Sequence, residues 1–182
     1  IVNAAWKLFY EQGYEDTTVE EIIELSGTSK GSFYHYFDGK DALLSTLSSL
    51  FDEKYEELTG LLTPEMTAME QLLFLNRELF HMIEDSISLD LLARLYSTQL
   101  TTNGEKHLLD HNRIYYKLLR KIIAKGQAEG QLSSRSNVNE MVKLYALCER
   151  ALLYDWCLCA GEYALTEYSA KVLPGFLSSF LP

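Results

Sequence analysis

Residues 17–37, TTVEEIIELSGTSKGSFYHYF, decide the fold of this chain. Val19 and Ile22 recur at helical spacing, and the string predicts two short helices separated by a glycine. Thr18 at the N-cap and Glu21 three residues later form a capping box, which satisfies free backbone N–H groups at a helix start. We therefore expect the first helix to begin at Val19.

The glycine at position 27 predicts a tight turn between the two helices. A helix commonly ends at a residue with positive φ, which glycine adopts without steric cost. Thr28 or Ser29 follows, and either can cap the next helix, which we expect over residues 30–37. The stretch therefore predicts a helix-turn-helix.

The second helix of this pair is expected to have one buried and one exposed side. Phe33 and Phe37 lie four residues apart and share a face, which predicts that both are core. Gly31 is a poor helix residue, by about 1 kcal/mol relative to alanine, which indicates that its backbone approaches something closely. The opposite side presents Lys30, Gly31, Ser32, Tyr34 and His35. Such a helix can pack its back into a core and place its front in the major groove of DNA.

The order of residues adds a family resemblance. The string GY-x-x-TTV-x-x-I-x-x-x-x-G-x-SKGSFYHYF-x-x-K-x-x-L, from Gly13 to about Leu44, closely resembles the signature of TetR (tetracycline-repressor-like) transcriptional regulators. The resemblance implies a DNA-binding domain over residues 1–46 and a regulatory domain for effector binding and dimerisation over residues 47–182. It also implies a repressor that binds a palindromic operator as a homodimer and is released by a small molecule.

The resemblance also implies which residues meet DNA. They are Thr17, Thr18, Thr28, Ser29, Lys30, Gly31, Ser32, Tyr34, His35 and Lys40. Thr17 and Thr18 match phosphate-contacting positions at the start of the first motif helix, and Lys40 matches a phosphate-contacting lysine that opens the next helix. Contacts to phosphate position such a protein, whereas contacts to base edges specify the sequence.

The charge of the chain is unusual for a DNA-binding protein, which commonly has a basic surface. The formal net charge is −10, and residues 1–47 carry three lysines against eight acidic residues, a net charge of −5. We expect the acidic residues to lie on helix faces away from DNA. The chain begins at Ile1 inside a helical pattern, and we expect a preceding segment, which in the family is often basic. The charge predicts modest non-specific affinity and steep salt sensitivity.

The remaining sequence predicts an all-α protein, because apolar residues recur at helical spacing nearly throughout. Asn137 and Glu140 form a second capping box, Pro174 is expected to kink or restart the last helix, and Asn103-Gly104 is expected to break the chain. We expect helices over about 41–62, from Thr63-Pro64 to beyond Ile83, over 89–100, from Glu105 to Gly126–Gly130, over 137–161 and over 166–181.

The helix expected over 137–161 is apolar on more than one side, which indicates burial on more than one side. A partner subunit would provide this cover. The family resemblance implies the same arrangement, since the last two helices, about 137–161 and 166–181, form the homodimer interface there. Two recognition helices about 34 Å apart would then read a palindrome.

The composition restricts location and chemistry. Cys148, Cys157 and Cys159 are expected to be buried, reduced thiols, because residues two apart on a helix point to different sides. No run of 18 apolar residues lacks charge, so we expect a soluble cytoplasmic protein. The sequence contains no H-E-x-x-H or G-x-S-x-G motif, so neither an enzyme nor a cofactor is expected.

Polar residues on apolar stripes are candidates for the effector site. They are Asn76, Tyr96, His111, Tyr115 and Asp155. Each has an alternative as a buried polar group satisfied by a neighbouring helix. Two other functions remain open from the sequence. His107 and His111 lie four residues apart and could serve a metal-responsive regulator, or a TetR-fold protein could have weak or lost sequence-specific DNA binding.

Overall fold

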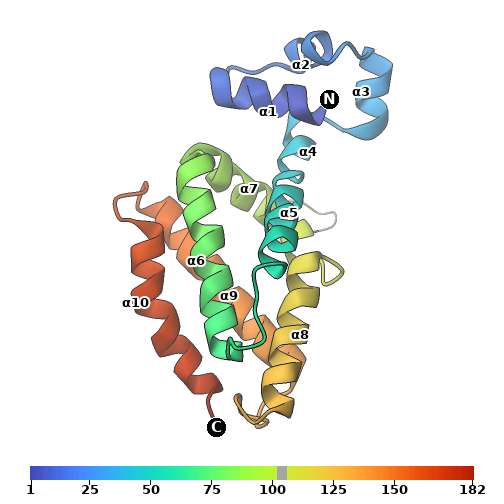
Figure 1. Cartoon of the computed structure of the whole chain (residues 1–182). Coiled ribbons are helices and arrows are strands. Elements are labelled where there is room, and N and C mark those ends of the chain that lie inside the picture. The colour runs from blue at the N-terminus through green and yellow to red at the C-terminus, as the bar shows by residue number, and fades with distance from the viewer. Residues whose placement is uncertain (102–105) are drawn as a thin grey trace. The chain divides into compact units, whose positions relative to one another are not determined.

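A computed structural model describes residues 1–101 and 106–182 (Figure 1). All regular structure within these ranges is helical, which confirms the predicted all-α class. The chain divides into two compact units. Unit 1 comprises Ile1–Leu50 and Asp90–Leu108, apart from residues 102–105, and unit 2 comprises Phe51–Leu89 and Leu109–Pro182. The divisions fall within α5 (Leu47–Thr59), within α7 (Leu89–Thr101) and between Leu108 and Leu109, so the proposed domain boundary after residue 46 stays a prediction.

Unit 1 contains α1 (Val2–Glu11), α2 (Val19–Ser26), α3 (Lys30–Tyr36) and α4 (Lys40–Leu44). Helix α1 packs against α2 and α4, and α2 packs against α3. The core side chains are nearly inaccessible to solvent: Ala5, Phe9, Ile22, Phe33 and Leu43. Phe33 is therefore core, as its spacing predicted, whereas Phe37 is only half-buried at the end of α3.

The single helix expected over residues 41–62 is instead two helices, because α4 ends at Leu44 and α5 begins at Leu47. Two hydroxyl side chains occupy the break. Ser45 Oγ donates to the carbonyl of Ala42 at 2.7 Å, and Thr46 Oγ1 donates to that of Leu43 at 2.6 Å. Such side chains compete with the backbone for hydrogen bonds and interrupt helices.

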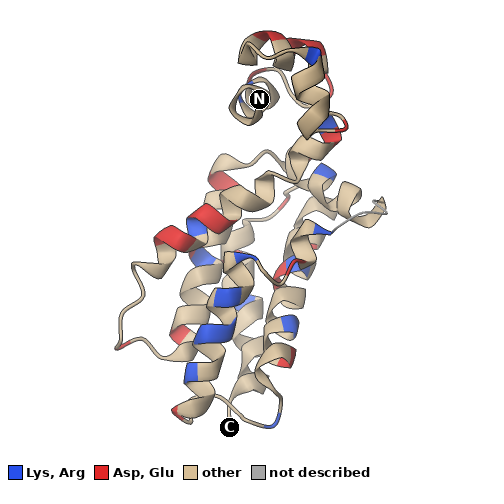
Figure 2. Cartoon of the chain, turned by 90° about the vertical axis from the view of Figure 1, so that its right-hand side faces the viewer, with Lys and Arg blue, Asp and Glu red and all other residues tan. Residues whose placement is uncertain are grey.

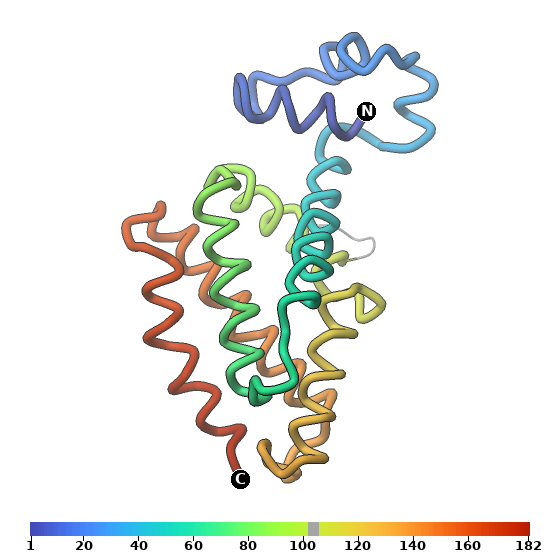
Figure 3. Tube along the Cα trace, viewed as in Figure 1, coloured from blue at the N-terminus to red at the C-terminus, as the bar shows by residue number. Residues whose placement is uncertain are grey.

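Unit 2 is built on α6 (Ala68–Ser86), α8 (Ile114–Ala128), α9 (Val138–Leu158) and α10 (Leu165–Leu177). Helix α6 packs against α8 and α10, and α9 packs against the same two helices (Figure 3). Gly126 allows α8 to approach the start of α6 closely. A Cβ at position 126 would lie 2.5 Å from the Cβ of Ala68, too close for any side chain.

Two helix starts in unit 2 differ from the prediction. Helix α6 begins at Ala68 rather than at Thr63-Pro64, because Thr67 and Glu70 form a capping box. A 3-10 helix (η1, His107–Leu109) precedes α8, which begins at Ile114; Glu105, the expected start, and the expected break at Asn103-Gly104 lie outside the described residues. Asn137 caps α9 by accepting from the N–H of Glu140 at 3.0 Å, as predicted.

Helix α10 continues through Pro174 to Leu177, and a 3-10 helix (η2, Ser178–Phe180) follows. The expected restart at the proline is therefore wrong. A proline leaves the carbonyl four residues earlier without its usual partner. Here that residue, Ala170, is exposed, so water can take the partner's place. None of the helices in the described ranges combines the length and the apolar character needed to cross a membrane.

Candidate nucleic-acid interface and regulatory core

The first motif helix is capped as the sequence predicted. Thr18 Oγ1 accepts from the N–H of Glu21 at 3.2 Å, and a carboxylate oxygen of Glu21 accepts from the N–H of Thr18 at 2.7 Å. The hydrogen bonds that this carboxylate accepts from the backbone N–H and the hydroxyl of Thr18 lower the pKa of the Glu21 carboxyl. Gly27 ends the helix with a φ of +65°, the left-handed conformation that the glycine predicted.

The start of α3 distinguishes between the two candidate caps. Ser29 Oγ accepts from the N–H of Ser32 at 3.1 Å and is the N-cap. The hydroxyl of Thr28 instead lies 2.7 Å from that of Ser26, in the preceding helix. Thr28 therefore links the end of α2 to the turn, while Ser29 sets the start of α3.

The outer side of α3 is exposed over its whole length. The side chain of Lys30 is 69% exposed, Tyr34 is 47% exposed, and Gly31, Ser32 and His35 are also exposed. Tyr36, which is 70% exposed, was not among the predicted contact residues. It lies three residues after buried Phe33, so helical spacing alone favoured the core side. Because α3 ends at Tyr36, this side chain lies beyond the core instead.

Two predicted phosphate contacts have structural partners in unit 1. Thr17 is fully buried, and its hydroxyl donates to the carbonyl of Gly13 at 2.7 Å. The Lys40 ammonium donates to the carbonyls of Tyr14, Glu15 and Thr17 at 2.6, 3.1 and 2.9 Å. Both side chains therefore shape the connection between α1 and α2. Their contact with DNA stays a prediction.

Tyr14 anchors this connection to two cations. Its ring lies 4.4 Å from Lys40 Nζ and 4.8 Å from the guanidinium carbon of Arg94 on α7, within the range of cation–π attraction. Its hydroxyl donates to Asp41, and burial raises its pKa. Arg94 also pairs with Glu15 at 2.6 Å. Within unit 1, α7 is thus joined to the segment that supports α2 and α3.

One acidic residue lies beside the recognition helix. The carboxylate of Glu20 is 3.3 Å from Lys30 Nζ, so the expectation that the acidic residues all lie away from the DNA side is wrong for Glu20. A backbone hydrogen bond and this lysine lower the pKa of the Glu20 carboxyl. A DNA phosphate that binds Lys30 must therefore compete with an exposed, weak ion pair.

A capped helix, a positive-φ glycine turn and a short helix with a buried back and an exposed polar front define unit 1 as containing a helix-turn-helix DNA-binding domain. Residues 1–47 match the model of the bacterial regulatory proteins, tetR family. The chain thus carries the DNA-binding domain of this family in these residues and is a DNA-binding transcriptional regulator, as the sequence signature predicted.

Curated relatives match the chain over different lengths. The fatty acid metabolism regulator protein of Bacillus subtilis is 23% identical over 177 residues, which cover 95% of this chain and 90% of that protein. The uncharacterized HTH-type transcriptional regulator YuxN of the same species is 41% identical over 64 residues, covering 35% of this chain and 22% of YuxN. The second match is therefore restricted to a small part of that relative.

Solved structures share the whole fold. The Thermus thermophilus regulator FadR, solved with lauroyl-CoA, has a TM-score of 0.79 at 24% identity and covers 100% of this chain and 93% of its own. FadR from Bacillus subtilis, solved with stearoyl-CoA, has a TM-score of 0.74 at 21% identity, with coverages of 98% and 97%. Identities in this range show the common fold.

The core of unit 2 contains a buried polar cluster around Glu149. This residue is 3% exposed, and its two carboxyl oxygens accept from the amide of Asn76 at 2.8 Å and from the hydroxyl of Tyr115 at 2.7 Å. Ser169 donates to the side-chain oxygen of Asn76 at 2.5 Å. Burial raises the pKa of Glu149, because the charged form is poorly solvated there. The cluster joins α6, α8, α9 and α10.

Two of the predicted effector residues, Asn76 and Tyr115, thus meet in one place. Sequence reasoning did not single out Glu149 as a candidate. The available signal was its position four residues after buried Tyr145, on the same face of α9. The hydroxyl of Tyr145 donates to the carbonyl of Leu72 at 2.8 Å, and burial raises its pKa.

The other predicted effector residues lie outside this cluster or in the other unit. Tyr96 belongs to unit 1. His111 is exposed, with its ring centroid 4.7 Å from that of Tyr116, and Asp155 is exposed and accepts from the hydroxyl of Tyr163 at 2.9 Å. His107 lies in unit 1 and His111 in unit 2. Among the described residues, no three His, Cys, Asp or Glu side chains are grouped to hold a metal.

The cysteines are less buried than predicted. Cys148, Cys157 and Cys159 are free thiols with partial exposure. Burial raises the pKa of Cys148 and Cys157 to about 11, so both thiols are protonated at neutral pH. This disfavours thiolate chemistry at these two positions.

Hollows also open between the described helices of unit 2. A groove of about 640 Å³ runs between α6 and α10, with Leu73, Phe74 and Pro174 in its walls and Asn76 and Ser169 among the residues that line it. A smaller pocket of about 220 Å³ lies beside α8 and the segment that follows α5. The groove therefore reaches the buried cluster through Asn76 and Ser169, which are hydrogen-bonded to one another.

Proposed function

We propose that this protein is a homodimeric repressor that binds a palindromic operator and is released by a long-chain acyl-CoA. The similarity to the Bacillus subtilis fatty acid metabolism regulator carries the proposal, since it extends over 95% of this chain and 90% of that protein. The two FadR structures that share the fold were solved with stearoyl-CoA and lauroyl-CoA, which supports the same effector class.

The exposed front of α3 reads the operator in this proposal. Tyr34 and His35 can contact base edges or the sugar–phosphate backbone, and Lys30 and Ser32 can contact phosphates. Since residues 1–47 carry a net charge of −5, phosphate neutralisation is limited. Specific contacts then contribute a larger share of the affinity than in a basic domain. A regulator of this kind acts in the cytoplasm, where the DNA is.

Exposed apolar side chains on the last two long helices support the homodimer. On α9, Leu147, Tyr154 and Leu158 are 53%, 46% and 66% exposed, and with Ala151 they follow the alternating spacing of four and three residues that lines helix–helix seams. On α10, Tyr168 is 42% exposed. A symmetric partner presenting the same surface would bury both rows.

An effector can release DNA only if it binds the DNA-free conformation more tightly than the DNA-bound one. Unit 2 offers the features that such a ligand needs. The groove between α6 and α10 has apolar walls, and two of its lining residues, Asn76 and Ser169, belong to the buried Glu149 cluster. A ligand that changes these hydrogen bonds would shift helices that share the cluster.

Footprinting on the DNA upstream of the protein's own gene tests the DNA half of the proposal. The full-length protein is expected to protect two half-sites related by a two-fold axis and one helical turn apart. Protection of a single site would contradict the proposal. So would the absence of any protected site, with the wild type and the Lys30→Ala variant giving the same footprint. The lost-DNA-binding alternative predicts the latter result.

A further inference from the structure

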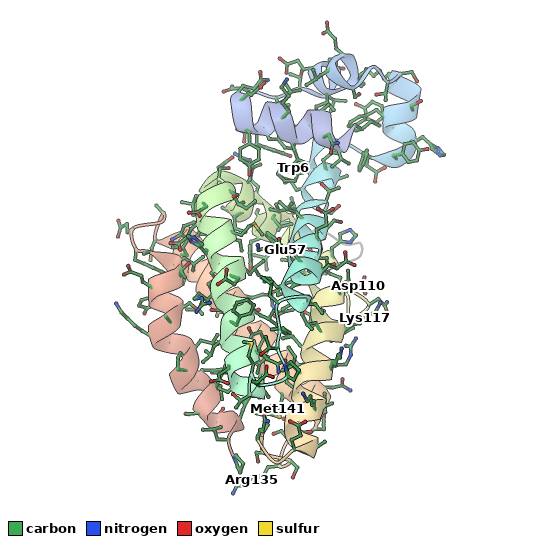
Figure 4. All side chains as sticks on the ribbon, in the orientation of Figure 1. Trp6, Glu57, Asp110, Lys117, Arg135 and Met141 are labelled. Carbon is green, nitrogen blue, oxygen red and sulfur yellow. The ribbon has the colours of Figure 1, made fainter. Side chains whose placement is uncertain are left out.

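Helix α8 is the most basic element of an acidic chain. Residues Ile114–Ala128 include Lys117, Arg120, Lys121 and Lys125 but no acidic residue, while the whole chain has a net charge of −10. The three lysines are spaced by four residues and follow one side of the helix. Figure 2 shows the basic positions recurring along α8, which faces the viewer there, and Figure 4 shows Lys117 on its outer side.

The partners of these cations differ along the helix. Arg120 donates to the carbonyl of His111 at 2.8 Å, so it is already used within the fold. Lys125 Nζ is 3.8 Å from Glu129, an exposed pair that water screens. Over the ranges that the structure describes, no carboxylate lies within ion-pair distance of Lys121. Lys121 and Lys125 can therefore bind an anion at little cost.

A pocket lies directly beside these two lysines. Its volume is about 220 Å³, and the two lysines line it together with Thr59, the last residue of α5, and with Thr63 and Pro64 from the segment that follows. The apolar side chains of Leu118 and Ile122 and the buried amide of Gln71 complete the lining. The lining residues thus combine two cations and two hydroxyls with buried apolar side chains.

The larger groove has the opposite charge character. The residues that line it include Glu65 and Glu70, and its arginine, Arg77, is 2.9 Å from Glu78. A phosphate placed there would meet carboxylates. Within unit 2, an anionic ligand group therefore has a better site beside α8 than between α6 and α10.

We infer that the pocket beside α8 binds the phosphate groups of the effector, with Lys121 and Lys125 as the charged contacts. This rests on the proposed function, in which the effector is an acyl-CoA. Lysine ammonium groups bind phosphate as compact positive charges with three donors each. The pocket equals about seven waters of liquid volume, enough for a diphosphate but not for a whole nucleotide.

Calorimetric titration of the full-length protein with dodecanoyl-CoA and with dodecanoate tests the inference. Lys121→Ala/Lys125→Ala is compared with Arg135→Ala/Lys7→Ala, which removes the same charge from exposed positions outside the pocket. The first variant is expected to bind dodecanoyl-CoA about 10- to 100-fold more weakly, since two charge-assisted contacts are lost. Dodecanoate, which has no phosphate, should bind both variants alike, and circular dichroism should show unchanged helix content.

The outcomes separate the inference from the proposed function. If the wild type binds dodecanoyl-CoA and the lysine variant binds it within twofold, the α8 site is wrong while the acyl-CoA proposal stands. If the wild type does not bind dodecanoyl-CoA, both are wrong. As a measurement without variants, free coenzyme A should protect Lys121 and Lys125, but not Lys143, from acetylation by an amine reagent. Equal labelling of all three at saturating coenzyme A would overturn the inference.

Discussion

Replacing Glu149 with glutamine should remove a pH dependence of stability. Burial raises the pKa of this carboxyl in the folded protein, whereas in the unfolded chain it titrates near about 4.3. Between these two values the folded state holds a proton that the unfolded state has released. The contribution of the protonated Glu149 carboxyl to the free energy of unfolding is therefore complete below the pKa of the unfolded chain. It is lost as pH rises toward the pKa of the folded protein.

The contacts of Glu149 set the size of the effect. Glutamine can keep both hydrogen bonds, because its oxygen can accept from Asn76 and its amide can donate to the hydroxyl oxygen of Tyr115. The variant cannot ionise. Each pH unit in the window is worth at most about 1.4 kcal/mol, so the variant should gain up to about 3 kcal/mol over the wild type between pH 5 and pH 7.

Urea unfolding followed by circular dichroism at pH 5, 6 and 7 measures this difference, at one protein concentration because a dimer's stability depends on it. The exposed Glu53→Gln serves as the control and should run parallel to the wild type. Parallel curves for Glu149→Gln and the wild type would refute the reasoning. The reasoning would also be refuted if the free energy of unfolding of the wild type rose relative to that of the variant as pH rises. That result would mean that the folded protein stabilises the ionised carboxylate.

Three further changes have defined outcomes. Gly126→Val should destabilise unit 2 by about 1–3 kcal/mol in thermal unfolding, because the new Cβ would lie 2.5 Å from Ala68 Cβ; an unchanged melting temperature would contradict this close approach. Arg94→Ala should lower the unfolding free energy by up to about 1 kcal/mol at low salt and less at 1 M salt, and equal losses at both would exclude a role for its exposed pairs. Leu147→Lys/Leu158→Lys should give a helical monomer by light scattering, whereas an intact dimer would place the interface elsewhere.

The helix-turn-helix was predictable from sequence because its determinants are local. The capping box at Thr18 and the positive φ at Gly27 depend on residues within one or two turns, and both are present as expected. Family similarity supplied the name of the domain. The burial of Thr17 was not predictable, since it depends on how the connection from Gly13 folds back.

The regulatory unit was less predictable because its key features depend on packing between distant segments. Asn76 and Glu149 lie 73 residues apart and form their hydrogen bond only once α6 and α9 are packed together. The helix breaks were missed for a different reason. Thr67, and not Thr63, caps α6 because Glu70 completes a capping box with Thr67. The hydroxyl of Thr46 ends α4 by a local hydrogen bond, which the spacing of apolar residues does not reveal.

In the proposed function, α3 binds a specific operator and an acyl-CoA releases the protein from it. The most direct test is a fluorescence-anisotropy titration of the labelled operator with full-length protein, with and without dodecanoyl-CoA. Lys30→Ala/Tyr34→Ala should weaken operator binding by about 1–3 kcal/mol per base-reading contact, relative to Lys7→Ala. For the wild type, we predict specific binding that saturating dodecanoyl-CoA weakens at least about tenfold, a typical size for allosteric coupling. If dodecanoyl-CoA binds the protein but leaves its affinity for the operator unchanged, the proposed function is contradicted.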